Sequence, residues 1–509
     1  MTPSTGRPAT ATSATATADP ARGRPVQAWS RPEPADIARL GRRLLRGVVK
    51  AARKDDAPTL ADLLAGHLGP EVAELPVVGT AWPSYEHVNV QLALEHWLGA
   101  PGRTSQEVGV SQYQHREFSL GDLAQDANYG PRAGSTARVQ LATGPDGQLH
   151  DCARCAVYLV DDDAGRVALL LREADPHGPG GPLVRLEALA HRPEEADRVL
   201  REVGELAVTH NVFRGQVLSF GSEMFGPRNG AALTFLPRPS LSRSELVLPE
   251  GALEVIERQV VGIAKARDAL RAARQHLKRG VLLHGAPGTG KTHTIRYLLG
   301  HLEGVTVVVL SGNALGAISQ ACSIARALQP AAVIVEDVDL IAEQRGMHPG
   351  QHPLLFQLLN EMDGLGEDVD VVFLLTTNRA DLLEPALASR PGRVDQAVEI
   401  PLPDAGARQA LIELYRGDLD LDVGDYGPVL ARTEGVTASF LKELLRRAAM
   451  VAIANNGTGH GRIRVTDLEM NAALDELLDT ASPLTRSLLG GGPGLAELYD
   501  PEGRHSARG

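Results

Sequence analysis

Short apolar runs alternate with amphipathic stretches through much of the second half of the chain. The apolar runs are GVLLHG, VTVVVLSG, AAVIVED, DVVFLLTTN and QAVEIPLP, and helical stretches separate them. This alternation is typical of a parallel sheet covered by helices on both faces. Further on, the strands stop and helical stretches follow: ARQALIELYRG, SFLKELLRRAAMVAIANN and TDLEMNAALDELLDT. We therefore predict an α/β domain over 252–405 and a helical lid subdomain over 406–480.

The region 35–240 has a mixed pattern. Helical periodicity runs through 35–70 and 85–99, and CAVYLVDDDAGRVALLLREAD indicates two strands around the turn Asp161–Gly165. LVRLEALA, VLSF and AALTFLP indicate further strands, and Pro193 opens an amphipathic helix. We expect a helical segment followed by an α+β region, whose fold the pattern does not assign.

Small and polar residues mark the boundaries between these regions. Residues 1–34 are rich in Thr, Ala, Ser and Pro, which predicts a disordered tail. The stretch PRPSLSRSELVLPEG separates the two regions at 237–251, and the Gly/Pro-rich stretch 481–509 predicts a flexible tail.

Composition narrows the class of protein. Hydrophobic residues make up 43% and charged residues 22% of the 509 residues, which is typical of a soluble globular protein. The sequence contains no apolar run of the roughly 20 residues that span a bilayer, and its N-terminus lacks the apolar centre of a secretory signal. Three cysteines are too few for a disulfide framework. We expect a cytoplasmic protein that does not enter a membrane. The net charge of −12 disfavours a nucleic-acid motor, which a salt-sensitive DNA-binding assay would test.

Residues 285–292 form a phosphate-binding motif. Gly285, Ala286, Pro287, Gly288, Thr289, Gly290, Lys291 and Thr292 match G-x-x-x-x-G-K-[ST], with an apolar strand before them and a helical stretch after. The glycines allow several main-chain N–H groups to point at phosphates, Lys291 offers a positive charge, and Thr292 offers a hydroxyl to Mg²⁺. His293 follows directly, and we expect its main-chain N–H to lie near the nucleotide.

A second apolar strand ends in carboxylates, at Glu336 and Asp337. A parallel strand beside the phosphate loop would place them next to Mg²⁺. One carboxylate, Glu336, would orient the hydrated metal together with Thr292, and the next would polarise the attacking water. The alternative is a strand end with solvated acids.

Two further polar features follow. Asn378 ends another apolar strand, where it could hydrogen-bond the attacking water or the γ-phosphate, or serve as an ordinary turn residue. Arg390 and Arg393 flank a Pro-Gly turn. They would act as arginine fingers in trans if they reached a neighbour's γ-phosphate, and the alternative is two solvated surface arginines.

Together these motifs resemble the AAA ATPases over about residues 252–480. The resemblance includes QVVGIAKARDAL, LLFQLLNEMDGL, LLTTNRADLLEPALASRPGRVDQAVEIPLPD and TEGVTASFLKELLRRAA in the family's order. It implies that Asn378 is the sensor residue and that Arg390 and Arg393 act in trans. It also implies that the main chain around Val261 and Gly262 contacts adenine, and that TEGVTASF begins a lid lining the same pocket. Family members form hexameric rings that remodel proteins, so ATP, Mg²⁺, further copies of the chain and an unidentified protein substrate are the expected ligands and partners.

The sequence departs from the family in three places. Most relatives have Asp then Glu at the acidic strand end, whereas this chain has Glu336 then Asp337, an order that also resembles the mitochondrial translocase of a folded iron–sulfur protein. The segment 311–330 holds Ala-Leu-Gly where threading relatives place an aromatic-apolar-Gly loop, and the sequence contains no HExxH zinc-protease motif. These departures favour an alternative of another class, a nucleotide-switched scaffold with little hydrolysis.

The pair Cys152 and Cys155 forms a single C-x-x-C. Zinc needs four ligands, and no second pair is visible, so zinc binding stands beside the alternative of ordinary thiols.

Overall fold

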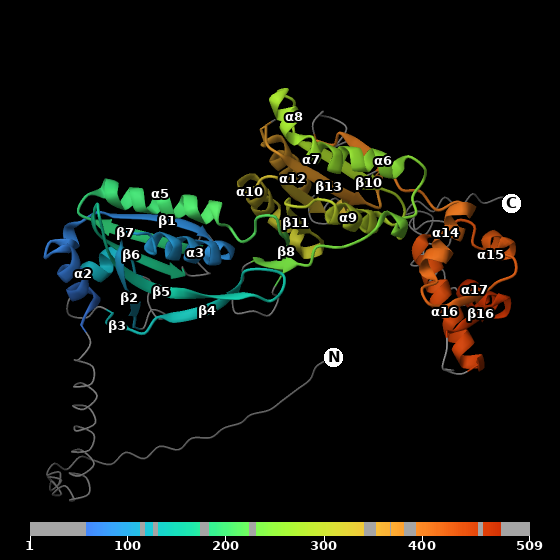
Figure 1. Ribbon diagram of the computed structural model, residues 1–509, viewed down its shortest axis with the longest axis horizontal. Coiled ribbons are helices and arrows are strands. Elements are labelled where there is room, and N and C mark those ends of the chain that lie inside the picture. The colour runs from blue at the N-terminus through green and yellow to red at the C-terminus, as the bar shows by residue number, and fades with distance from the viewer. Residues whose placement is uncertain are drawn as a thin grey trace, which may run out of the picture. The chain divides into compact units, whose positions relative to one another are not determined.

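The computed structural model describes most of the chain between residues 58 and 479 (Figure 1). The described segments are 58–111, 118–125, 131–173, 183–222, 231–339, 353–366, 368–380, 393–456 and 462–479. The predicted tails at 1–34 and 481–509 lie outside these residues, as does Arg390.

The N-terminal domain is built on a seven-stranded sheet in which every strand pair is antiparallel. The strand order is β1-β7-β6-β5-β2-β3, and β4 also pairs with β5. The strands are β1 (Val77–Pro83), β2 (Thr104–Val110), β3 (Ala133–Gly134), β4 (Ala137–Ala142), β5 (Leu149–Asp162), β6 (Gly165–Glu173) and β7 (Leu183–Ala190). The helices are α2 (Leu60–Leu68), α3 (His87–Leu98), α4 (Leu120–Gln125) and α5 (Pro193–Thr209).

Both faces of this sheet are buried along its central strands β5, β6 and β7. Leu169 and Leu171 of β6 pack in the core that α3 and α5 cover, whereas Ala168 and Leu170 pack in the core under α2 and α4. A strand buried on both faces shows a continuous apolar run instead of alternation, which is why the sequence indicated strands here but not their fold. The two strands around Asp161–Gly165, the strand LVRLEALA and the helix from Pro193 are confirmed.

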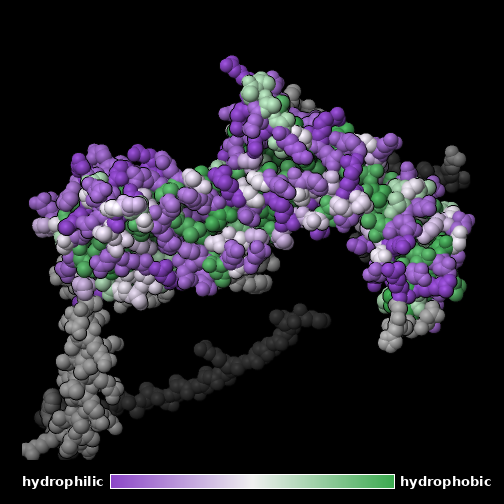
Figure 2. All heavy atoms as spheres, in the orientation of Figure 1, coloured by the Kyte–Doolittle hydropathy of each residue, from purple (hydrophilic) through white to green (hydrophobic). Residues whose placement is uncertain are grey.

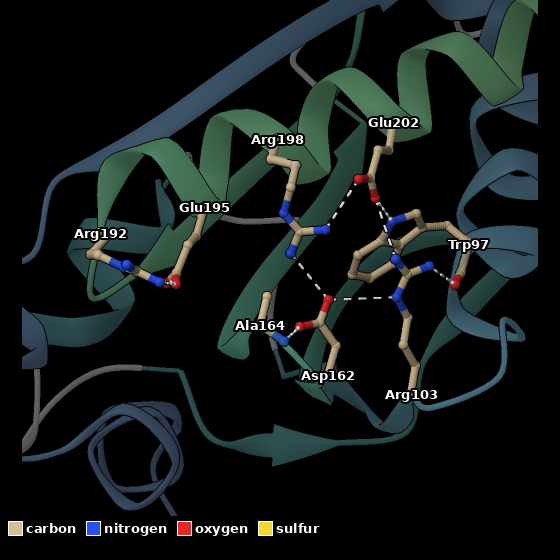
Figure 3. A network of polar contacts seen from close by, with 8 residues as sticks. All are labelled: Trp97, Arg103, Asp162, Ala164, Arg192, Glu195, Arg198 and Glu202. Atoms are coloured by element: carbon tan, nitrogen blue, oxygen red, sulfur yellow. Dashed lines mark hydrogen bonds and ion pairs between the residues drawn. The ribbon is translucent and has the colours of Figure 1, made fainter.

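A polar network fixes α5 to the sheet and to α3 (Figure 3). Trp97 Nε1 donates to Glu202 Oε2 at 2.7 Å, and the Arg103 guanidinium lies 4.0 Å from the centroid of the Trp97 ring. Arg198 and Arg103 both pair with Asp162, at 3.2 and 3.6 Å. The outward side of α5 is hydrophilic (Figure 2), and the half-buried Arg198 and Glu202 at its margin join this helix to Asp162 at the end of β5 and to Trp97 of α3.

The second sheet has the order β14-β10-β13-β12-β11-β8-β9 and is parallel except for β9. Its strands are β8 (Val217–Ser222), β9 (Ala231–Leu236), β10 (Arg279–His284), β11 (Thr306–Leu310), β12 (Ala331–Val335), β13 (Val371–Thr377) and β14 (Gln396–Glu399). Alternate residues of β12 face two cores: Ala332 and Ile334 pack with α9 (Lys291–Gly300), and Val333 and Val335 pack with α10 (Ile318–Ala327) and α12 (Pro353–Asp363). The predicted parallel sheet with helices on both faces is confirmed.

Strands β8 and β9 belong to this second sheet, although the sequence pattern placed them in the N-terminal region. β8 pairs in parallel with β11, and β9 pairs with β8. The composition change at 237–251 therefore follows these two strands in the sequence and does not mark where the second sheet begins. The reason is that a polar stretch marks a surface segment, whereas sheet membership depends on pairing with a distant strand. Val88 and Cys152 of the N-terminal domain share a core with Phe220 of β8.

The lid subdomain contains α14 (Ala405–Tyr415), α15 (Gly427–Arg432), α16 (Ala438–Asn456) and α17 (Asp467–Asp479). We expected no strands here, and that was wrong: β15 (Asp420–Asp422) pairs in parallel with β16 (Arg464–Thr466). Three residues are too few for a periodic signal. Among the described helices of the whole chain, none is long and apolar enough to span a membrane.

Candidate nucleotide site

The phosphate loop joins the end of β10 to the start of α9. Three of its glycines have positive φ: 146° at Gly285, 77° at Gly288 and 110° at Gly290. A Cβ on Gly285 would lie 2.2 Å from the carbonyl oxygen of Ile400, so the close approach also requires glycine. The fold therefore gives this loop the curled main chain that phosphate binding needs.

Lys291 is buried, with 6% of its surface exposed. Its Nζ donates to the carbonyl oxygens of Gly285 and Ala286, both at 2.8 Å. Burial lowers the pKa of Lys291, and the charges of Asp337 and Asp339 oppose that shift. The ammonium therefore sits inside the loop, within reach of whatever anion the loop holds.

Glu336 lies beside Thr292 at the start of α9, close enough for the hydroxyl to act on the pKa of the carboxyl. Burial raises the pKa of Glu336, and the charge of Asp337 adds to the effect, while Thr292 and Arg296 oppose it. A hydroxyl and a carboxylate are hard oxygen donors, so these two residues fit Mg²⁺, which would bind here and neutralise phosphate charge.

Asp337 faces the end of the neighbouring strand β13. Its main-chain N–H donates to Thr376 Oγ1 at 3.0 Å, and Asn378 Nδ2 lies 3.4 Å from Asp337 Oδ1. Asp337 has a left-handed main chain, with φ of 52°. Asp adopts this conformation more readily than Glu does, so the backbone itself favours the shorter acid at this position.

Sequence reasoning missed Asp339, which is 6% exposed and lies at the same edge. Its Oδ1 accepts from Thr377 Oγ1 at 2.9 Å and from the main-chain N–H of Asn378 at 3.1 Å. The sequence does show a third acid two residues after Asp337. Nothing in the sequence pattern identifies its partners on β13.

The expected adenine side lies where α6 (Ala252–Glu257) continues into the π-helical turn η5 (Arg258–Gly262). Val261 is buried in the core under α9. The guanidinium of Arg279 donates to the carbonyl of Gln259 at 3.1 Å and pairs with Asp370 at 3.0 Å, which braces this turn against the sheet. Adenine contact through Val261 and Gly262 stays a prediction.

The lid meets the phosphate loop at the start of α16. The main-chain N–H of Ser439 donates to the Gly288 carbonyl at 3.3 Å. A Cβ on Gly288 would lie 2.9 Å from Ser439 Oγ and 3.1 Å from Thr437 Oγ1. The segment TEGVTASF thus contacts the loop itself.

His293 is held by its side chain to the linker between β9 and α6. Its Nε2 lies 3.2 Å from the Glu245 carbonyl oxygen, which makes this nitrogen the donor. Arg238, earlier in the linker, donates to the carbonyls of Leu299, Leu302, Gly215 and Val305 at 2.8–2.9 Å. The linker is therefore anchored near both ends of α9, which the sequence did not indicate.

The structure does not bring Arg393 to the phosphate loop of its own chain. Its Nε and Nη2 bind the two carboxylate oxygens of Asp363 at 3.0 and 2.7 Å, and only 7% of Arg393 is exposed. It is thus not the solvated surface arginine of the alternative interpretation. Its predicted action in trans stays a prediction.

The two cysteines of the C-x-x-C motif lie in different cores. Cys152 packs with β8 and α10, whereas Cys155 packs under α2 and α4. Burial raises the pKa of each thiol to about 12. Within the described segments, no group of three or more His, Cys, Asp or Glu side chains is suited to a metal ion. Ordinary buried thiols are the interpretation that this packing supports.

The sequence is similar to known ATPases over the residues that form this site. Residues 281–402 match the ATPase family associated with various cellular activities (AAA). This chain carries an AAA ATPase domain. Its relatives include ATP-dependent zinc metalloprotease FtsH 2 of Symbiobacterium thermophilum, with 34% identity over 43% of this chain and 39% of the relative. FtsH 3 of Sphaerobacter thermophilus is 33% identical over 50% of this chain and 54% of the relative. The chain thus spans about half or less of the length of these curated relatives.

Proposed function

We propose that this chain is an ATP-hydrolysing subunit of an oligomeric, cytoplasmic AAA motor that remodels a protein or an assembly. The observation that carries the proposal is the meeting of three strand ends. Lys291 and Thr292 follow β10, Glu336 and Asp337 follow β12, and Asn378 follows β13. Each supplies a different group that phosphoryl transfer to water requires.

Hydrolysis would divide among these groups as follows. Lys291 and the loop N–H groups bind the β- and γ-phosphates, and Thr292 and Glu336 hold Mg²⁺ and its water. Asp337 and Asn378 position the attacking water, with Asp337 accepting its proton. A carboxylate only accepts hydrogen bonds, so Asn378 must turn its Nδ2 toward Asp337, which leaves its Oδ1 to accept from that water.

Arg390 and Arg393 would complete the site of a neighbouring subunit, so binding of MgATP would draw subunits together. The Asp363–Arg393 pair keeps the second arginine at a fixed place in its own chain. Mixing Arg393→Ala subunits with Asp337→Asn subunits tests this arrangement, because mixed oligomers contain interfaces with one intact finger and one intact acid. Recovered turnover supports action in trans, and no recovery at any mixing ratio argues against it.

Threading of a polypeptide has less support than remodelling without threading. The Ala-Leu-Gly segment lies in η6 (Gly312–Ala317), where Leu315 is 5% exposed and packs in the core that also holds Phe220 of β8. A side chain buried in this way does not grip a substrate. This burial and the short Asp337 favour the second candidate, a nucleotide-switched scaffold.

Turnover separates the two candidates. For a motor, Lys291→Ala should lose turnover and the wild type should hydrolyse ATP steadily. For a scaffold, the wild type should bind ATP tightly and turn over little more than Lys291→Ala does. Unchanged turnover in Lys291→Ala would contradict the site itself.

A further inference from the structure

Asp339 is a buried carboxylate for which the steps above have no role. It lies beyond β12, and its Oδ1 accepts two hydrogen bonds from the end of β13. We propose that Asp339 is a positioning residue that sets the place of Asn378 for hydrolysis. The inference rests on the proposed ATPase function.

Asn378 is held at two points. Its main-chain N–H donates to Asp339 Oδ1 at 3.1 Å, and its side-chain Nδ2 faces Asp337 Oδ1 at 3.4 Å. The longer distance makes the side-chain contact the weaker of the two. The main-chain bond to Asp339 therefore determines where the amide of Asn378 lies, and a displacement of about 1 Å at such a group can reduce a rate by roughly 100-fold.

Thr377 links Asp339 to the main chain beyond Asn378. Its hydroxyl donates to Asp339 Oδ1 at 2.9 Å, and its oxygen accepts from the main-chain N–H of Arg379 at 2.9 Å. Asp339, Thr377 and the main chain on either side of Asn378 thus form one connected set. Because Thr377 is fully buried, no water replaces Asp339 as the acceptor without a rearrangement of the strand end.

The geometry separates the acceptor role of Asp339 from its charge. Both hydrogen bonds arrive at the same oxygen, Oδ1, so an asparagine can keep both through its single carbonyl oxygen. Asp339→Asn therefore removes the charge and keeps the acceptor, whereas Asp339→Ala removes both. A positioning role predicts that the two variants differ.

The test measures kcat and KM for ATP, and the Kd of a fluorescent ATP analogue, for the wild type, Asp339→Asn and Asp339→Ala. We expect Asp339→Ala to lose about 100-fold in kcat while KM and Kd change little, and Asp339→Asn to keep most of the wild-type kcat. Wild-type kcat in Asp339→Ala would overturn the proposal. An Asp339→Asn variant as slow as Asp339→Ala would also overturn it, because charge would then be the contribution.

A double-mutant cycle shows whether Asp339 acts through Asn378. If it does, Asp339→Ala should reduce kcat far less in an Asn378→Ala background than in the wild type. Independent losses that multiply would contradict the proposal. If Asp339→Ala does not fold, Thr377→Val serves in its place, because it removes one of the two hydrogen bonds and keeps the volume. If the wild type has no turnover, both the proposed function and the role of Asp339 are wrong. If the wild type and the variants turn over equally, only the role of Asp339 is wrong.

Discussion

Arg238 should stabilise the C-terminal end of α9 more than any single apolar contact there. Its guanidinium donates four hydrogen bonds to main-chain carbonyls, one to Leu299 in the last turn of α9 and one to Leu302 just after this helix ends. Hydrogen bonds from charged donors contribute about 1.5–3 kcal/mol each. The net loss is smaller than the sum of four bonds for two reasons. Burial lowers the pKa of Arg238, because the buried charge loses hydration, and this cost is absent in the variant. Water can also replace some of the lost hydrogen bonds. We therefore expect Arg238→Met to destabilise α9 by a net amount of about 3 kcal/mol.

Hydrogen exchange with mass spectrometry measures this loss directly. About 3 kcal/mol corresponds to roughly 100-fold faster exchange in peptides from α9. Arg238→Lys should lose about half as much, because an ammonium donates from one atom and cannot match a guanidinium that donates from two. Arg271→Met, on the exposed helix α8 (Arg267–Ala272), is the control and should leave α9 unchanged. If exchange in Arg238→Met is less than fivefold faster than in the wild type, these hydrogen bonds do not stabilise the end of α9.

Three other predictions follow from the described contacts. Because the pKa of Glu336 is raised above 4.5, Mg²⁺-dependent turnover should fall during acidification sooner than for an ordinary glutamate, while the fold gains stability as this group protonates. Excess Mg²⁺ should shift that acid limb to lower pH, because the metal and the proton compete for the carboxylate, and a limb that Mg²⁺ does not move would implicate another group. Glu202→Gln should lower N-terminal-domain stability in urea by about 1 kcal/mol, read from tryptophan fluorescence, since its ion pairs are partly exposed; an unchanged midpoint would show that the charge of Glu202 contributes nothing. Asp337→Glu should raise kcat if carboxylate reach limits hydrolysis, and a kcat at or below that of the wild type, in a variant as stable as the wild type despite the left-handed main chain at this position, would exclude that limit.

Local signals predicted much of the ATPase domain. The strand before the phosphate loop, the strand that ends just before Glu336 and the strand that ends just before Asn378 are all encoded within a few neighbouring residues, and each is a strand of the observed sheet. The alternation of strands and helices also indicated the sheet, because a strand buried on both faces and a helix differ in length and periodicity.

Contacts between distant segments could not be predicted in this way. The sequence does not identify the partners of Asp339 and Arg393, which lie 38 and 30 residues away. Likewise, β8 joins the ATPase sheet by pairing with β11, and nothing in the short run VLSF distinguishes that neighbour from the N-terminal strands. Which strand pairs with β8 depends on which strand edge is free in the folded chain, and a short run of residues does not contain that information.

Steady-state ATP turnover of the wild type, measured against protein concentration, shows whether the nucleotide site depends on a neighbouring subunit. Turnover per subunit should rise with concentration and then level off, because each site needs arginines from a neighbour. Turnover that stays near zero at every concentration, despite tight ATP binding, would contradict the proposed motor function and favour the switched scaffold.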